Sequence, residues 1–226
     1  HVGDQCRLTL DGNEQYHSGE AFREAWQQFE ADDEIRWLID HLIFVEQPFH
    51  RDVALSQKLG EALRNWKQRP PMIIDESDGE IESLPRGLQL GFHGTSHKNC
   101  KGIFKGLANA CLLEKRRRDD SDHPALLSGE DLANVGPVAL TQDLCVMATL
   151  GITHVERNGH HYFAGLSNFP HSIREAVTEV FASLYQSDDR HGAKLRVEHG
   201  RIDLTDILNA PFGVGIEPQR FADGMG

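Results

Sequence analysis

The chain has 226 residues, of which 39% are hydrophobic and 26% charged, and its formal net charge is −12. This composition is typical of a soluble globular protein with a substantial core, and the acidic balance makes nucleic acid a poor partner. No apolar run approaches the roughly 20 residues of a membrane helix, and residues 1–5 do not form a signal peptide. We therefore expect a cytoplasmic protein with no nucleic-acid partner and no membrane partner.

Along the chain, short apolar segments alternate with segments of helical periodicity. The predicted strands are 6–10, 42–45, 72–74, 92–96, 125–127 and 152–155, and the predicted helices are 18–38, 53–66, 81–90, 102–113 and 138–150. Ser18 is the expected N-cap of the first helix. Single helices between strands favour parallel pairing with right-handed crossovers. Because no Rossmann glycine fingerprint is present, a barrel is favoured over an open sheet.

From Gly165 onward this alternation stops. A predicted helix at 173–184, a short strand pair around 195–203 and the segment 211–215 make up the rest of the chain. We expect residues 1–165 to form barrel strands with a metal site. Residues 166–226 are expected to be a C-terminal helix and capping segment of the same barrel domain.

Basic and sulfur-containing residues suggest no further site. The basic run Lys115–Arg118 is followed at once by acidic residues, so we interpret it as a solvated helix end and loop. Cys6, Cys100, Cys111 and Cys145 form no CxxC pair, which argues against zinc. Their apolar or helical flanks predict reduced, mostly buried thiols.

Three successive predicted strands end in an acidic residue. Asp11, Glu46 and Asp75 each follow apolar residues, at separations of 35 and 29 residues, which is about one strand–helix unit each. The carboxyl ends of parallel strands converge on the mouth of a barrel. Three carboxylates there repel one another unless a cation binds them, and oxygen ligands suit Mg²⁺. Each acid alone could instead cap the next helix, but the repetition favours a metal site.

The segments around these acids resemble the three metal-ligand motifs of the enolase superfamily, above all of its mandelate racemase and muconate-lactonising branches. The motifs are Asp11-Gly-Asn13, Glu46-Gln47-Pro48 and Ile74-Asp75-Glu76-Ser77, with further similar segments at His154-Val-Glu156-Arg157 and Pro211-Phe-Gly-Val-Gly215. The resemblance implies a TIM-like (β/α)₇β barrel, present from about strand 3 to the C-terminus. The N-terminal α+β lid domain and the first strands would precede residue 1. Since the chain also begins without Met, we expect an excerpt or a truncated protein.

The resemblance also implies a cofactor and a reaction class. Mg²⁺, held by Asp11, Glu46 and Asp75 with Glu76 beside them or binding a water, would stabilise the enediolate formed when the α-proton of a carboxylate is removed. The base would be a lysine or histidine, and a lysine needs a nearby cation or burial to lower its pKa. Lys98, 23 residues after Asp75, lies near the position of the family's sixth-strand lysine.

The segment around Lys98 departs from the family pattern. It reads Lys98-Asn-Cys-Lys-Gly102 where the family has a lysine followed by two later glycines, so Ser96, His97 and Lys101 compete with Lys98 for the catalytic position. A purely structural role for the segment is a further alternative. A phosphate-binding loop is disfavoured because Gly-x₄-Gly-Lys-Ser/Thr does not occur in that order.

The remaining candidate residues are also assigned by the resemblance. Glu156 matches the last-strand acid of the racemase branch, which hydrogen-bonds the substrate, although an ion pair with Arg157 is an equal alternative. No histidine ends the strand at 125–127, so the racemase His–Asp dyad is missing. Candidate substrate contacts, each with capping or plain surface as the alternative, are Asn13, Ser128, Glu130 and His161.

These observations predict a Mg²⁺-dependent lyase or isomerase: a dehydratase, epimerase or cycloisomerase acting on a small-molecule carboxylate. We expect it to form a homo-oligomer. The alternative is a barrel that binds metal and carboxylate without chemistry, as a sensor or scaffold. A metal-dependent hydrolase is a weaker hypothesis, because such barrels usually use histidine-rich ligands.

Overall fold

The computed structural model describes residues 6–120, 123–130, 134–156, 163–190 and 192–216. The chain forms two compact units, of which the first comprises residues 1–97 and 104–128 and the second residues 98–103 and 129–226. Each unit has its own hydrophobic core. The expected segments 1–165 and 166–226 of one barrel domain stay a prediction.

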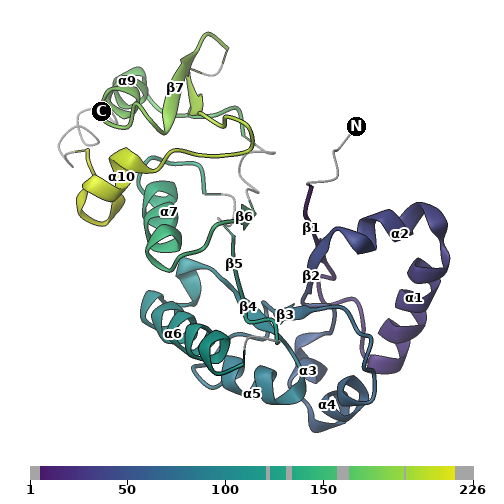
Figure 1. The fold of residues 1–226 in the computed structure, drawn as a ribbon. Coiled ribbons are helices and arrows are strands. Elements are labelled where there is room, and N and C mark those ends of the chain that lie inside the picture. The colour runs from purple at the N-terminus through teal and green to yellow at the C-terminus, as the bar shows by residue number, and fades with distance from the viewer. Residues whose placement is uncertain (1–5, 121–122, 131–133, 157–162, 191, 217–226) are drawn as a thin grey trace. The chain divides into compact units, whose positions relative to one another are not determined.

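Strands and helices alternate through most of the chain (Figure 1). In order they are β1 (Leu8–Asp11), α1 (Gly19–Ala31), α2 (Asp33–Asp40), β2 (Leu42–Glu46), α3 (Arg51–Ala54), α4 (Gln57–Arg64), β3 (Met72–Ile74), α5 (Ser83–Leu90), β4 (Gly94–His97), the 3₁₀ helix η1 (Asn99–Lys101), α6 (Ile103–Asp119), β5 (Leu126–Glu130), α7 (Ala139–Thr149), β6 (Val155–Glu156), α9 (His171–Val180), β7 (Tyr185–Asp188), β8 (Gly192–Leu195), α10 (Thr205–Asn209) and the 3₁₀ helix η2 (Pro211–Gly213).

The strands β1 to β6 form one sheet in the order of the sequence. The pairs β1–β2, β2–β3, β3–β4 and β5–β6 are parallel. Consecutive order is what a barrel wall requires, whereas an open doubly wound sheet reverses its order at a switch point. The predicted α/β class with a parallel sheet is confirmed. A complete barrel is not shown, because β1 and β6 are the edge strands among the residues that the structure describes.

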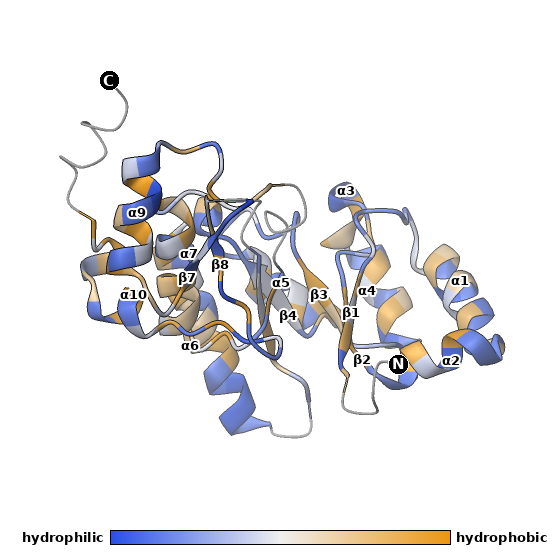
Figure 2. Ribbon diagram, turned by 90° about the horizontal axis from the view of Figure 1, so that it is seen from above, coloured by the Kyte–Doolittle hydropathy of each residue, from blue (hydrophilic) through white to orange (hydrophobic). Residues whose placement is uncertain are grey.

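Aromatic side chains centre the core of the first unit. The ring of Phe22 lies 5.0 to 5.9 Å from the rings of Tyr16, Trp26, Phe49 and Trp66, measured between centroids. Such pairs add to the free energy gained by burying the rings. They fix α1 against the segments that follow β2 and α4. In Figure 2 the strand β3 is coloured as hydrophobic, and the helices α1 and α4 carry both hydrophobic and hydrophilic residues.

Two predicted long helices are each divided in the structure. The helix expected at 18–38 begins at the N-cap Ser18, whose hydroxyl accepts a first-turn N–H at 3.2 Å as predicted, but it stops at Asp32. Asp32 has extended backbone, and its carboxylate caps α2 by accepting an N–H at 2.9 Å. Ser56 divides the helix expected at 53–66 in the same way, as the N-cap of α4. Mid-segment capping residues therefore override the apolar periodicity.

The strands β4 and β5 approach closely at Gly94. A Cβ atom on this residue would lie 1.7 Å from the carbonyl oxygen of Leu126, so only glycine fits. Leu126 N–H donates to the carbonyl of His93 at 2.8 Å and begins the pairing. Strand β5 then runs to Glu130, beyond the predicted 125–127, because the glycine and serine in this segment continue the extended backbone instead of ending it.

The second unit contains a β-hairpin, three α-helices and two 3₁₀ helices among its described residues. The hairpin pairs β7 with β8 in antiparallel fashion, from Tyr185 opposite Leu195 to Asp188 opposite Gly192. Within the strand pair predicted around 195–203 there is a single antiparallel bridge, between Glu198 and Arg201, and the hairpin itself lies earlier in the chain. Gly192 has a φ of 72°, in the left-handed region that glycine adopts without strain, so the chain turns earlier than the sequence pattern predicts.

Two further expectations have mixed outcomes. The basic run Lys115–Arg118 lies in the last turns of α6 as expected, and Glu114 accepts hydrogen bonds from Arg117 and Arg118 at 3.0 and 2.8 Å. The expectation of mostly buried thiols is wrong: Cys100 and Cys111 are exposed, and the other two cysteines are only partly covered.

The helices give no sign of a membrane segment. Within the described part of the chain, none of them combines the length and the apolar character that crossing a bilayer requires.

Candidate functional site

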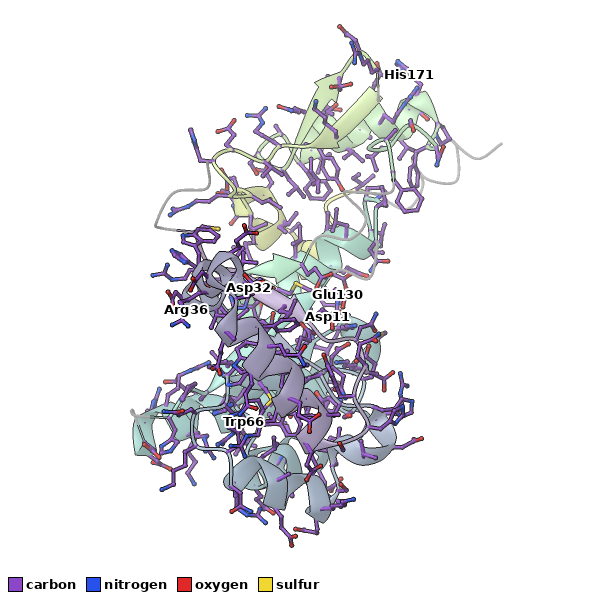
Figure 3. The ribbon with its side chains drawn as sticks, turned by 90° about the vertical axis from the view of Figure 1, so that its right-hand side faces the viewer. Asp11, Asp32, Arg36, Trp66, Glu130 and His171 are labelled. Atoms are coloured by element: carbon purple, nitrogen blue, oxygen red, sulfur yellow. The ribbon has the colours of Figure 1, made fainter. Side chains whose placement is uncertain are left out.

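Asp11, Glu46 and Asp75 lie where the sequence predicts, at or directly after the carboxyl ends of β1, β2 and β3. Figure 3 labels Asp11 at the end of its strand. The backbone register pairs Asp11 with Glu46, and Glu46 with Ile73. Side chains alternate along a strand, so Ile73 and Asp75 point to the same face. The register thus places all three acids on one face of the sheet.

Glu46 and Asp75 form a close and nearly buried pair. They are 6% and 3% exposed, and a carboxylate oxygen of one lies within 4.8 Å of a carboxylate oxygen of the other. Two buried like charges so close together favour the binding of a cation. Two oxygens on one Mg²⁺, each at about 2.0–2.1 Å, are separated by about 4 Å or less. A small adjustment would therefore fit this donor pair to a hard divalent cation.

Asp11 differs from the other two acids because it is exposed. Its Oδ1 accepts the N–H of Asn13 at 2.8 Å, which forms an Asx turn. Asp11 does not belong to the cluster of carboxylates, with oxygens within 4.8 Å of one another, that contains Glu46 and Asp75. A ligand role for Asp11 requires its carboxylate to rotate away from this turn. Asn13, the predicted substrate contact, is also exposed and has a φ of 42°.

The loop after β1 is joined to the loop after β2 through the backbone. The N–H groups of Gly12 and Glu14 donate to the carbonyls of Glu46 and Gln47, each at 2.8 Å. A Cβ atom on Gly12 would lie 2.6 Å from the Cα of Pro48, so this contact requires glycine. The first two predicted ligand motifs therefore form one tightly packed surface, which the sequence spacing alone did not indicate.

Gln47 is a functional candidate that the sequence analysis missed. It is completely buried, and its φ is 32°, in the left-handed region. Its Nε2 donates to the Phe49 carbonyl and to the Ser77 hydroxyl, each at 2.7 Å. Its Oε1 accepts the N–H of Asp75 at 2.7 Å and that of Ser77 at 3.3 Å. The side chain thus joins the second and third ligand motifs.

A second missed cluster surrounds Asp78, which is 2% exposed. Lys105 Nζ lies 3.0 Å from its Oδ1, while Thr95 Oγ1 and Asn109 Nδ2 donate to its Oδ2 at 2.8 and 3.1 Å. Lys105 also donates to the main-chain carbonyl of Asp78. The N–H of Asp78 in turn donates to the carbonyl of Asp75 at 2.9 Å. This ion pair therefore anchors the loop after β3 to β4 and α6.

One sequence signal could have revealed this cluster. Lys105 and Asn109 are polar residues one turn apart, interleaved with Gly106 and Leu113, which are buried positions of α6. A lysine and an amide on the buried face of a helix require buried partners. No comparable signal marks Gln47, because its role depends on a loop that begins nearly 30 residues later.

Two of the alternatives to Lys98 as the proton-transfer group, Ser96 and His97, end strand β4 and point to opposite faces of the sheet. Ser96 and His97 are 1% and 4% exposed. Side chains alternate along β4, so His97 lies on the same face as Thr95, whose hydroxyl donates to Asp78. Ser96 lies on the other face, together with Gly94. Gly94 is the register partner of Ile73, so this is the face of Ile73 as well. Ser96 therefore points to the side of the acids, and His97 to the opposite side.

Lys98 and Glu130 form an ion pair in the second unit. Lys98 Nζ lies 2.5 Å from Glu130 Oε2, and the two side chains are 12% and 13% exposed. Figure 3 labels Glu130, which ends β5 and is a strand residue. An ammonium group held in this way must separate from the carboxylate and lose its proton before it can act as a base.

The other candidates lie at strand ends or outside the described residues. Ser128 is buried within β5, at 5% exposure. Glu156 is exposed in β6, and its Cα pairs with that of Glu130 across the strand pair. Arg157 and His161 lie outside the residues that the structure describes.

Comparison with known proteins yields no relative: no family model matches the chain, and no curated protein matches it. The functional interpretation therefore rests on the residues and their arrangement.

Proposed function

We propose that the first unit binds one Mg²⁺ ion through Glu46 and Asp75, with Asp11 as the third ligand, and that the protein uses it to remove the proton α to a substrate carboxylate. The supporting observation is the pair of nearly buried carboxylates at neighbouring strand ends, with oxygens within 4.8 Å. In this proposal the sheet is the wall of an enolase-superfamily (β/α)₇β barrel. The bound ion would stabilise negative charge on the substrate carboxylate.

The protein's own groups supply the proton transfer in this proposal. Lys98 directly follows β4, whose Thr95 pairs with Ile74 in β3, and it is the proposed base. It must first leave Glu130, so substrate binding has to compete with that ion pair. Glu156, at the end of β6, is the proposed partner of the substrate carboxylate. The reaction that follows proton removal, whether dehydration, epimerisation or cycloisomerisation, stays a prediction. The homo-oligomer stays a prediction as well.

The metal site is tested by calorimetric titration with Mg²⁺. We expect Asp75→Asn and Glu46→Gln each to weaken binding at least about tenfold, because each removes an anionic ligand from a two- or three-carboxylate site. Asp52→Asn is the control, since the Asp52 side chain is 80% exposed and lies in the same unit. Equal affinities for the wild type and Asp75→Asn would contradict the ligand assignment.

The chemistry is tested by exchange of substrate α-protons with deuterated solvent. A panel of small carboxylates is incubated with the protein and Mg²⁺, and incorporation of deuterium is followed by NMR. We expect Lys98→Met to abolish exchange while leaving Mg²⁺ affinity nearly unchanged, because lysine supplies the base and not a metal ligand. Exchange that continues at the wild-type rate would remove Lys98 from the mechanism.

A second candidate function is binding of a carboxylate without turnover. The observation that favours it is the close pairing of Lys98 with Glu130, which occupies the group proposed as the base. The same panel distinguishes the two. Metal-dependent carboxylate binding without any deuterium incorporation would favour a sensor or scaffold over an enzyme.

A further inference from the structure

Gln47 connects three strand-end loops where the two buried acids lie. It directly follows Glu46, and its carbonyl accepts the N–H of Glu14 from the loop after β1. Its side-chain oxygen accepts the N–H of Asp75 at 2.7 Å. Both carboxylates of the close pair are therefore attached to one residue, Glu46 by a peptide bond and Asp75 by a hydrogen bond.

The conformation of Gln47 is strained and fully determined by its surroundings. A φ of 32° is unfavourable for any residue other than glycine, and such strain persists only where neighbouring contacts enforce it, often at functional sites. The amide offers two donor hydrogens and one acceptor oxygen, and all of them are used. Because the side chain is 0% exposed, water cannot replace a lost partner.

We infer that Gln47 is a positioning residue that fixes the separation of Glu46 and Asp75 and thereby determines which divalent ion the site accepts. This inference rests on the proposed metal site. Mg²⁺ requires near-octahedral geometry with short bonds of about 2.0–2.1 Å, whereas Ca²⁺ tolerates irregular geometry at about 2.3–2.6 Å. A rigid pair of carboxylates favours Mg²⁺, and a loosened pair loses that preference.

The test measures the affinities of Mg²⁺ and Ca²⁺ by calorimetry on the wild type and Gln47→Met. In the variant we expect Mg²⁺ affinity to fall about 10- to 100-fold, the usual effect of removing a residue that orients a ligand. Ca²⁺ affinity should fall much less, so the preference for Mg²⁺ over Ca²⁺ drops about tenfold or more. The control is Leu63→Ala, which empties a fully buried core position of the same unit. It should lower stability and leave the preference unchanged.

A measurement without metal tests the positioning itself. Exchange of the Asp75 and Ser77 amide hydrogens should accelerate in Gln47→Met, because both donate to Gln47 Oε1, and should not accelerate specifically in Leu63→Ala. If Gln47→Met does not fold, Gln47→Asn keeps a polar amide and tolerates the positive φ, but its shorter side chain withdraws the acceptor oxygen from both N–H groups. It should show the same faster exchange and reduced Mg²⁺ preference.

The outcomes separate this inference from the proposed function. Unchanged amide exchange in both Gln47 variants would overturn the positioning role, and an unchanged Mg²⁺/Ca²⁺ ratio in a folded variant would overturn the role in ion choice. A wild type that binds neither ion would overturn the proposed metal site and the role in ion choice. The exchange measurement would still decide the positioning role.

Discussion

At the carboxyl ends of β2 and β3 the first unit buries two acids, Glu46 and Asp75, whereas at the amino ends of β3 and β4 it holds a half-buried neutral histidine, His93. Burial, with a smaller contribution from the charge of Arg69, lowers the pKa of His93 to about 4. The unprotonated Nδ1 of His93 accepts the N–H of Met72 at 3.0 Å. The amino ends of the strands thus carry a neutral imidazole that accepts a hydrogen bond, and the carboxyl ends carry two carboxylates close together.

Under the proposed function, this difference corresponds to separate tasks at the two ends of the strands. In parallel α/β architectures the carboxyl ends carry function and the amino ends carry stability. Two buried carboxylates placed close together repel each other and lower the stability of the fold. Such an arrangement is expected where an ion or a substrate must bind, since function often costs stability. The comparison predicts that substitutions at the amino ends change folding and that those at Glu46 or Asp75 change binding.

The largest expected effect is at the amino end of β4. Gly94→Ala should abolish folding or cost more than about 4 kcal/mol of unfolding free energy, because the new Cβ would overlap the backbone of β5, which cannot move aside like a side chain. Chemical denaturation followed by circular dichroism measures this. Gly79→Ala, with no atom within 4 Å of its Cβ, is the matched control and should change little. A stable Gly94→Ala would refute the close approach of β4 and β5.

Asp78 shows whether every acid at the carboxyl ends is functional. Asp78→Asn should cost about 3–5 kcal/mol, because it leaves the ammonium of Lys105 buried without its counter-charge. Urea denaturation gives the difference from the wild type. The control is Glu114→Gln in an exposed ion pair of α6, where a loss of less than about 1 kcal/mol is expected. A loss of similar size in both variants would mean that the Asp78 pair is not buried in solution.

His93 predicts a pH dependence at the amino ends. In the unfolded chain its pKa is near 6.5 and in the folded protein about 4, so between these values the unfolded state binds more protons. The stabilisation is complete above about pH 6.5 and is lost as the pH falls toward 4, by up to roughly 3 kcal/mol. Denaturation at pH 7 and pH 4.5 should show a smaller difference for His93→Gln than for the wild type. An identical difference would exclude His93 as the source.

The smallest expected effect on stability is that of Asp75→Asn without metal. We expect a change within about 1 kcal/mol, since the lost repulsion from Glu46 offsets the lost interactions of the charge. Thermal denaturation in the presence of a chelator measures it. With Mg²⁺ added, the wild type should gain thermal stability and the variant should gain less. A large loss of stability in the chelated variant would make Asp75 a structural acid like Asp78.

Much of the fold was predictable from local patterns. Strands β2 and β3 lie within one residue of their predicted bounds, because runs such as Met72–Ile74 are wholly apolar and buried on both faces. The helices between them carry apolar periodicity, and Ser18 caps α1 as predicted. Errors arose where one residue decided the outcome: Asp32 ended α1, and Gly129 continued β5 beyond the predicted end at residue 127.

The sequence by itself determined that acids end three successive parallel strands, since residue type and position along a strand are local properties. Only the tertiary structure decided that Glu46 and Asp75 are buried together while Asp11 is exposed, and that Gln47 joins their loops. It also decided that Lys98 pairs with Glu130. These outcomes depend on contacts between segments some 30 residues apart, which strand register and loop packing fix, and no local pattern encodes them.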